Sequence, residues 1–106
     1  MITVNHIQEM SELLKILSDQ SRLSMLALLR EGELCVCDLV ELVGLSQPGV
    51  SQHLKKMKAV GLVNETRKSQ WIYYSLNIDD KPYVKAVLDT IPSLKDKIDS
   101  MKNRCC

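Results

Sequence analysis

Four cysteines are the residues of this chain best suited to chemistry, and they stand in two close pairs. Cys35 and Cys37 are separated by one residue, and Cys105 and Cys106 are adjacent at the end of the sequence. There is no basic N-terminal stretch followed by an apolar run, and no apolar run is long enough to cross a bilayer. We therefore expect a cytoplasmic protein with no membrane partner and with mostly reduced thiols. Metal binding or redox sensing then explains the cysteines better than a structural disulfide does.

A second group of polar side chains lies on one face of the helix predicted to begin after Ser46. Ser46 is a suitable N-cap, Pro48 fits the first turn, and Val50, Leu54 and Met57 recur at helical spacing. The opposite face carries amide, hydroxyl, imidazole and ammonium groups without a carboxylate: Gln47, Ser51, Gln52, His53, Lys55 and Lys56. Such a face suits the edge of a base pair and a phosphate.

The basic residues are concentrated in the middle of the chain. All 106 residues together carry a formal net charge of +1, but residues 46–70 hold five Lys or Arg against one acidic residue. A local excess of positive charge on a nearly neutral protein is typical of a nucleic-acid surface. The hydrophobic content of 45% suits one domain, and the absence of Phe indicates a helical core of Leu, Val, Ile and Met.

Apolar periodicity divides this single domain, residues 1–106, into successive elements. We predict two supporting helices over 5–31, a helix-turn-helix over 35–60, a β-hairpin wing over 62–76, a helix over 80–102 and a cysteine tail over 103–106. The third helix falls within residues 33–44, and the hairpin turn lies around residues 67–69. Pro92 should interrupt the last helix, and Ser93 with Asp96 predicts a capping box after it. The fold class is mainly α with a small β-hairpin, in the order α-α-α-α-β-β-α, and contains a helix-turn-helix.

The first and last helices carry more apolar surface than a small core centred on residues 23–76 can bury. An unpartnered helical stripe on a small domain commonly meets its copy across a two-fold axis. We therefore expect a homodimer that forms through these two helices.

These features resemble the ArsR/SmtB-type winged helix-turn-helix repressors of bacteria. The resemblance spans residues 8–78 and is carried by the stretches 17–23, 45–54 with 61–63, and 71–76. The run Glu-Leu-Cys-Val-Cys-Asp-Leu at residues 33–39 is similar to the arsenite-binding motif of the arsenical-resistance repressors in that family. The resemblance implies a homodimeric repressor that binds double-stranded operator DNA and dissociates when As(III) or Sb(III) binds Cys35 and Cys37. It implies no required cofactor and no enzymatic activity.

One position departs from the best-known arsenite sensors, in which a third cysteine follows three residues after the second. Here that position is Val40, so the usual three-thiolate site is incomplete. By analogy with members that recruit cysteines from elsewhere in the chain, Cys105 or Cys106 could supply the third thiolate. The last helix has no His, so the zinc site that other members build there is not expected.

The spacing of Cys35 and Cys37 suggests how binding could change DNA affinity. On an α-helix, residues i and i+2 project about 200° apart, so both cannot grip one ion from an intact helix. If both cysteines lie at the start of the third helix, binding a soft ion would have to distort its first turn. The distortion would move the recognition helices of a dimer out of the spacing of about 34 Å that successive major grooves require.

Roles on the DNA side follow from the chemistry of the side chains. Gln47, Ser51 and Gln52 are predicted to reach base edges, because Gln can pair bidentately with adenine, and His53 could join them. Phosphate contacts are assigned to two basic residues of the helix and two of the wing: Lys55, Lys56, Arg67 and Lys68.

Other interpretations of the cysteines remain open. A thiol-based redox or persulfide sensor of the same fold would use a disulfide as its signal, and a two-thiol site suits it better than a three-thiol site does. A thiol enzyme is disfavoured, because no strand-loop-helix thioredoxin pattern surrounds Cys35 and Cys37 and no catalytic constellation accompanies them. The pair could also be small apolar residues of the core.

Overall fold

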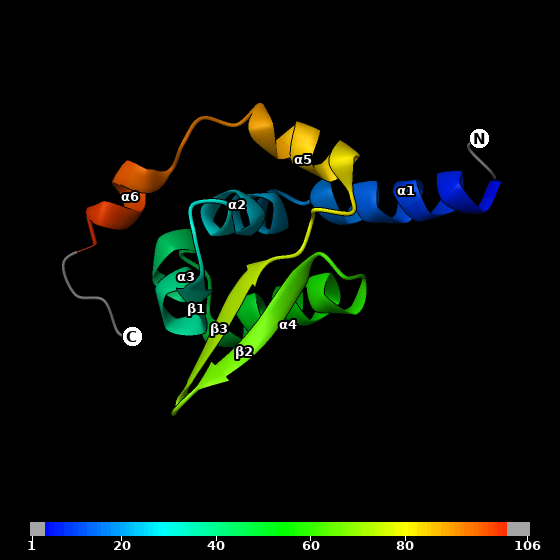
Figure 1. The fold of residues 1–106 in the computed structure, drawn as a ribbon. Helices are drawn as coiled ribbons and strands as arrows, with labels where there is room; N and C mark the ends of the chain where they lie inside the picture. Colours follow the sequence, from blue (N-terminus) through cyan, green and yellow to red (C-terminus); the bar gives the residue numbers. More distant parts are fainter. Residues whose placement is uncertain (1–3, 102–106) are drawn as a thin grey trace.

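Helices pack against one small antiparallel sheet in the computed structural model, which describes residues 4–101 (Figure 1). In chain order the elements are α1 (Val4–Leu17), α2 (Gln20–Leu29), β1 (Leu34–Cys35), α3 (Val36–Val43), α4 (Gln47–Ala59), β2 (Val63–Lys68), β3 (Trp71–Leu76), α5 (Pro82–Asp89) and α6 (Lys95–Asp99). The predicted architecture, mainly α with a helix-turn-helix followed by a hairpin, is confirmed.

A third strand joins the predicted hairpin. β1 pairs antiparallel with β3 and places Cys35 opposite Tyr73, so the strand order is β1-β3-β2. The third helix lies within residues 33–44 as predicted, but it begins only at Val36, and the sequence did not predict the strand formed by Leu34 and Cys35. Two apolar residues are too few to show a strand period, and their partner strand is distant in sequence. Consequently Cys35 belongs to the sheet, while Cys37 belongs to the helix.

The helices α3 and α4 meet at the tight turn that the sequence predicts. Gly44 ends α3 with φ +72°, a left-handed conformation that favours glycine. The Oγ of Ser46 accepts a hydrogen bond of 3.2 Å from the N–H of Gly49 and caps α4 as predicted. The predicted apolar stripe of α4 is fully buried: Val50, Leu54 and Met57. Burial of this stripe turns the polar face of α4 away from the core.

The hairpin turn lies further along the chain than predicted. β2 continues through Arg67 and Lys68, and the pairing of Lys68 with Trp71 leaves only Ser69 and Gln70 to connect the strands. Ser69 has φ +59°, which a two-residue hairpin loop of this kind requires. The prediction of a turn around residues 67–69 is therefore wrong, and both basic side chains project from the end of a strand.

The C-terminal segment forms the two short helices α5 and α6, with the interruption that Pro92 predicts. The predicted capping box is wrong, because α6 begins after Leu94 without a side-chain cap. Instead, the Oγ of Ser93 accepts a hydrogen bond of 3.2 Å from the N–H of Lys95.

Two charged residues at the end of α2 hold this segment against the body. The guanidinium of Arg30 donates hydrogen bonds to the carbonyls of Ile91 at 2.7 Å and Pro92 at 2.9 Å. The carboxylate of Glu31 accepts a hydrogen bond of 3.2 Å from the N–H of Leu94, which lowers the pKa of Glu31. The end of α5 and the start of α6 are therefore fixed to the helix that forms the centre of the core.

Candidate DNA interface and thiol site

Cys35 occupies the junction between β1 and α3. It is the N-cap of α3, with φ −82° and ψ 162°, and its Sγ accepts a hydrogen bond of 3.4 Å from the N–H of Asp38. The Cys35 side chain is only 1% exposed. Because its backbone is extended, the two cysteines do not share the first turn of α3, and the argument from opposite faces of one helix does not apply. The sulfur of Cys35 instead contacts the end of the helix directly.

Cys37 lies in the first turn of α3 and is half-buried. Neither Cys35 nor Cys37 is a free thiol in the structure. Val40, where a third motif cysteine would stand, is half-buried and packs against the core. Within residues 4–101, no group of three His, Cys, Asp or Glu side chains is placed to hold a metal ion. The predicted third donors, Cys105 and Cys106, lie outside the described residues.

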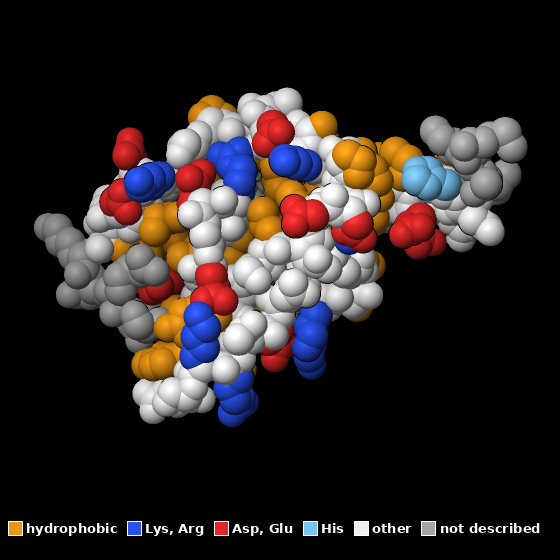
Figure 2. Space-filling model, in the orientation of Figure 1, with side chains coloured by type: hydrophobic (Ala, Val, Ile, Leu, Met, Phe, Trp, Pro, Cys, Tyr) orange, Lys and Arg blue, Asp and Glu red, His pale blue; other side chains and the backbone are white. Residues whose placement is uncertain are grey.

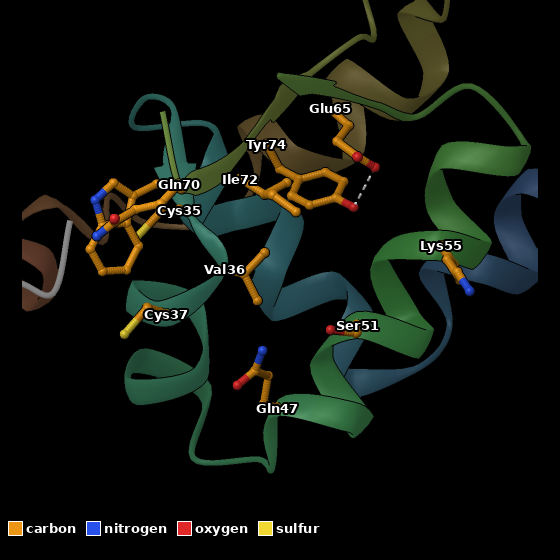
Figure 3. A pocket seen from close by; sticks show the side chains of 11 residues that line it. Cys35, Val36, Cys37, Gln47, Ser51, Lys55, Glu65, Gln70, Ile72 and Tyr74 are labelled. Carbon is orange, nitrogen blue, oxygen red and sulfur yellow. Dashed lines mark hydrogen bonds between the residues drawn. The ribbon is translucent and has the colours of Figure 1, made fainter. Parts of the chain in front are cut away.

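A cavity of about 490 Å³ connects the cysteines with the recognition helix and the wing (Figure 3). Cys35 and Cys37 line one end, where Gln70 of the hairpin lies beside Cys35, and Ser51 and Lys55 of α4 lie at the other end. Figure 3 shows Val36 and Gln47 pointing toward one another across the space between α3 and α4. The remaining walls are formed by Ser51 and Lys55 of α4 and by Glu65, Gln70, Trp71, Ile72 and Tyr74 of the wing. The structure therefore brings the predicted thiol site and part of the predicted DNA-contact face to one cavity.

The predicted DNA-contact residues of α4 divide into two neighbouring stripes. Gln47, Ser51 and Lys55 follow each other at intervals of four residues and line the cavity. Gln52 and Lys56, both exposed, form the adjacent stripe. Within the described part of the chain, no carboxylate pairs with either lysine. These five side chains share one carboxylate-free face of the helix.

His53 lies on a different side of α4. Its Nδ1 is 3.3 Å from Nη1 of Arg22, and the Nε of the same arginine donates a hydrogen bond of 2.8 Å to the carbonyl of Ile16. The N–H of Arg22 also hydrogen-bonds the Asp19 carboxylate, which lowers the pKa of Asp19 and caps α2. His53 therefore connects α4 to the α1–α2 junction, apart from the other predicted DNA contacts.

The predicted basic residues of the wing are both exposed, but their surroundings differ. Lys68 forms an ion pair with Glu33, which raises the pKa of Lys68, and its Nζ lies 4.8 Å from the ring centre of Tyr73. Arg67 forms no ion pair within residues 4–101. Figure 2 shows Lys and Arg side chains gathered with a few acidic ones around the hairpin end of the molecule. The charge of the wing is therefore partly neutralised by nearby carboxylates.

Sequence reasoning missed a second paired lysine. Lys58, in the last turn of α4, forms an ion pair of 3.0 Å with Glu65 of β2, and this hydrogen bond lowers the pKa of Glu65. The hydroxyl of Tyr74 donates a hydrogen bond of 2.9 Å to the same carboxylate (Figure 3). Burial, together with Glu65, raises the pKa of Tyr74 to about 12. These contacts fix the hairpin to the recognition helix, and only the position of Lys58 on the basic helix could have suggested them.

An apolar groove runs along α1, which extends from the body of the molecule (Figure 1). Ile7 is 58% exposed and Leu14 is 41% exposed, and Met10 lies between them. Large apolar side chains exposed together on one helix are typical of an interaction surface. No helix in the described part of the chain is long and apolar enough to span a membrane.

Known proteins match both the sequence and the fold. The family model described as "Bacterial regulatory protein, arsR family" matches residues 19–65. The arsenic resistance transcriptional regulator ArsR1 of Pseudomonas putida is 44% identical over 70% of this chain, which spans 59% of that relative's length. The arsenical resistance operon repressor of Staphylococcus aureus is 41% identical over 92% of this chain and 88% of its own.

Solved structures of transcriptional regulators share the fold. HlyU from Vibrio cholerae gives a TM-score of 0.75 at 32% identity over 83% of this chain and 92% of its own, and its reduced form gives 0.73 over 81% and 87%. A homodimeric winged helix-turn-helix DNA-binding domain from Mycobacterium bovis gives 0.69 at 25% identity over 86% and 82%. The matched proteins are regulators of transcription rather than enzymes. The chain belongs to the ArsR family of bacterial transcriptional repressors.

Proposed function

We propose that the chain is a homodimeric arsenical-resistance repressor, which leaves its operator when As(III) or Sb(III) binds Cys35 and Cys37. Two relatives carry arsenic or arsenical resistance in their names. The single observation that carries the proposal is the cavity shared by both cysteines and the recognition helix. A ligand on the cysteines would occupy the same space that Gln47, Ser51 and Lys55 border.

For DNA binding, α4 is proposed to enter the major groove with its carboxylate-free face. Gln47, Ser51 and Gln52 would read base edges, and Lys55, Lys56 and Arg67 would contact phosphates. Lys68 would join the phosphate contacts only after it leaves Glu33. His53 is assigned to holding α4 in place through Arg22, since that contact occupies its Nδ1 edge.

The dimer is proposed to form through α1 and the C-terminal helices. The groove around Ile7 and Leu14 supplies exposed apolar surface, and the M. bovis neighbour with the same fold is homodimeric. Two-fold symmetry would place two recognition helices about 34 Å apart, the spacing of successive major grooves. The operator would then contain two related half-sites.

The residues present fit a trivalent metalloid in part. Cys35 and Cys37 are soft sulfur donors, which As(III) and Sb(III) prefer to oxygen or nitrogen. A third thiolate is proposed to come from Cys105 or Cys106. Each As–S bond would replace an As–OH group, with the thiol proton leaving in water, so the cysteines must first be reduced.

The N-cap contact of Cys35 suggests how a metalloid bound to the cysteines would weaken DNA binding. If the sulfur turned toward a ligand, Asp38 N–H would lose its partner, and a lost cap costs a helix about 1 kcal/mol. β1 would also shift against β3, because Cys35 pairs with Tyr73. A coupling of about 1–3 kcal/mol between the two sites would weaken DNA binding by one or two decades.

A redox or persulfide sensor of the same fold is the second candidate. Two observations favour it: neither Cys35 nor Cys37 is a free thiol in the structure, and the V. cholerae neighbour has been solved in a form described as reduced. In this case the oxidised pair itself, rather than a metalloid, would release DNA.

Measuring which compound releases DNA distinguishes the metalloid sensor from the redox or persulfide sensor. The operator is first selected from random duplexes with the reduced full-length protein, and its binding is followed by fluorescence anisotropy. Arsenite in the presence of a phosphine reductant should release DNA from the parent and leave Cys35→Ser and Cys37→Ser bound. Release by peroxide or polysulfide, with no response to arsenite under reduction, would favour the redox sensor.

A further inference from the structure

We propose that Lys81 is a positioning residue for operator recognition. Its buried ammonium group fixes the end of the recognition helix α4 to the start of α5, and it thereby sets the spacing of DNA half-sites that a dimer accepts. This inference rests on the proposed function, because it assumes a dimer that forms through α1 and the C-terminal helices and reads DNA with α4.

Lys81 is only 8% exposed, which is rare for a lysine because burial removes water from the charged group. Its Nζ donates hydrogen bonds to the carbonyl of Gly61 at 3.0 Å, to the carbonyl of Asn77 at 3.3 Å and to the carboxylate of Asp80 at 2.9 Å. An ammonium group has three N–H donors, so this set of acceptors is complete. The contacts hold the side chain of Lys81 in one position, unlike the exposed lysines of α4.

The Gly61 carbonyl belongs to the turn that ends α4. The N–H of Gly61 donates a hydrogen bond of 3.0 Å to the carbonyl of Lys58, and the N–H of Leu62 donates one of 2.9 Å to the carbonyl of Met57. With φ +80° at Gly61, this is the Schellman arrangement that closes a helix. The positive charge of Lys81 therefore lies beside the C-terminal end of α4, where the helix dipole favours a cation.

Asn77, which follows β3 directly, makes a second connection to the same turn. Its Nδ2 donates a hydrogen bond of 3.1 Å to the carbonyl of Gly61, and its N–H donates one of 2.9 Å to the carbonyl of Leu62. The carbonyl of Asn77 in turn accepts from Lys81. The end of α4, the chain after β3 and the start of α5 are therefore joined in one hydrogen-bonded unit.

The helix α5 is fixed by a cation at each end. Lys81 precedes its first residue, and the guanidinium of Arg30 donates a hydrogen bond of 2.7 Å to the carbonyl of Ile91, just beyond its last turn. The start of α5 also lies beside α1 (Figure 1), since burial raises the pKa of Tyr83 and Glu9 of α1 adds to the effect. Because α1 and α5 both belong to the proposed dimer interface, Lys81 connects that interface directly to the recognition helix.

Two recognition helices that are fixed to the dimer interface can read only half-sites at the matching distance. Adjacent base pairs lie about 3.4 Å apart and are rotated by about 34°, since one turn of about 34–36 Å contains 10–10.5 base pairs. One base pair added between the half-sites therefore displaces and rotates the second half-site away from a rigid dimer. A dimer in which the end of α4 is free to turn tolerates the same change better.

The test uses two duplexes and the reduced full-length protein. One duplex is the operator selected from random sequences, and the other carries one added base pair between its half-sites. Fluorescence anisotropy measures the binding of the parent, Lys81→Met and Lys85→Met to both. Methionine keeps an unbranched apolar chain without the N–H donors. Lys85 is exposed on α5, so Lys85→Met removes the same charge without touching the turn and is the matched control.

We expect Lys81→Met to bind the selected operator about tenfold more weakly than the parent, within the range typical of coupling between two sites. Its affinity for the duplex with the added base pair should stay within about threefold of the parent, so the ratio of the two affinities shrinks. Lys85→Met should keep the ratio of the parent. Asn77→Ala, which removes one hydrogen bond from the same turn, should shrink the ratio by about threefold.

Circular dichroism and sedimentation check that each variant is folded and dimeric. Asn77 is exposed, so Asn77→Ala decides the question if Lys81→Met does not fold or dimerise. A folded, dimeric variant whose affinity falls by one common factor for both duplexes, or does not fall at all, overturns the inference and leaves the proposed function standing. If the parent selects no operator with two half-sites, the proposed function is wrong and the inference fails with it.

Discussion

The two halves of the candidate DNA surface hold their positive charges in different ways. On α4, Lys55 and Lys56 are exposed and have no acidic partner within residues 4–101. At the wing the lysines are paired: Lys68 with Glu33, and Lys58, in the last turn of α4, with Glu65 of β2. An unpaired lysine can approach a phosphate without losing an existing contact. A paired lysine must first give up its carboxylate, so its net contribution to DNA binding is smaller.

The wing also lies close to the thiol site. Glu33, the partner of Lys68, directly precedes β1, and Cys35 ends that strand. The sheet therefore gives the cysteines a connection to the wing in addition to the connection through α3. Lys55 and Lys56 of α4 have no carboxylate to leave within residues 4–101, whereas Lys68 of the wing would have to leave Glu33 before it could contact a phosphate.

The largest effect on operator binding is expected from the unpaired lysines of α4. Lys55→Ala/Lys56→Ala should weaken operator binding by at least about tenfold at low salt and make the log–log salt dependence shallower by about one per lysine. Anisotropy titrations over a range of salt concentrations measure both quantities. Lys85→Ala, on the exposed face of α5, is the matched control and should bind like the parent. An unchanged salt slope in the double variant would remove these lysines from the interface.

The contact that fixes the wing to α4 predicts a dependence of stability on alkaline pH. Because the pKa of Tyr74 is raised to about 12, the protonated phenol is favoured in the folded state. Its contribution is complete below the unfolded pKa of about 10 and is lost as pH rises toward 12. Urea unfolding should show that the parent loses on the order of 1 kcal/mol more over this range than Tyr74→Phe does. Parallel pH curves for the two proteins would contradict the assignment.

The carboxylates of the same contacts act in the opposite pH direction. The pKa of Glu65 is lowered, mainly by its hydrogen bond with Lys58. Its stabilising effect is therefore present above the unfolded pKa and is lost as the pH falls through the folded value. In urea unfolding, Glu65→Gln should lose less stability than the parent as the pH falls, and the exposure of the pair limits this difference in the free energy of unfolding to less than about 1 kcal/mol.

A modest gain of DNA affinity is expected when the wing is released. Glu33→Gln removes the charge that holds Lys68, so binding to operator and to unrelated duplex should both strengthen, by about two- to threefold. Filter binding with the two DNAs measures the change. Glu41→Gln, also exposed and without an ion pair in the part of the chain that the structure describes, serves as the control. Weaker binding in Glu33→Gln would show that Glu33 positions the wing instead of competing with phosphate.

The smallest effect is expected from Lys68 itself. Lys68→Ala should weaken operator binding by less than about threefold, because the lysine exchanges one anionic partner for another. In the Glu33→Gln background the same substitution should cost more. A double-mutant cycle at low salt measures this coupling, and strictly additive effects would refute the competition between Glu33 and DNA.

The sequence was most informative where the physical signal is local. The Ser46 cap, the buried stripe of Val50, Leu54 and Met57, and the Gly44 turn depend on neighbours within a few residues, and all three were predicted correctly. β1 was missed because two residues give no period and their partner lies far along the chain. The N-cap role of Cys35 was missed for the same reason.

Individual residues of the candidate site could be predicted from the sequence, but the contacts between them could not. Gln47 and Cys35 were identified from type and spacing, yet their common cavity depends on how α4 packs against the sheet. The ion pairs Lys58–Glu65 and Lys68–Glu33 join separate elements, and hydrophobic periodicity does not predict that these elements lie next to each other. His53, which sequence reasoning grouped with the base contacts, lies against Arg22, because its face of the helix turns toward α2.

The central claim is that the cysteine pair and the DNA-contact face are energetically coupled. The most direct test asks whether bound DNA weakens arsenite binding as much as bound arsenite weakens DNA binding. Arsenite binding to the reduced protein is titrated through Trp71 fluorescence, once alone and once with saturating operator DNA. If arsenite weakens DNA binding, the DNA must weaken arsenite binding by the same factor, about 5- to 150-fold for a coupling of 1–3 kcal/mol. Equal arsenite affinities with and without DNA would contradict the claim.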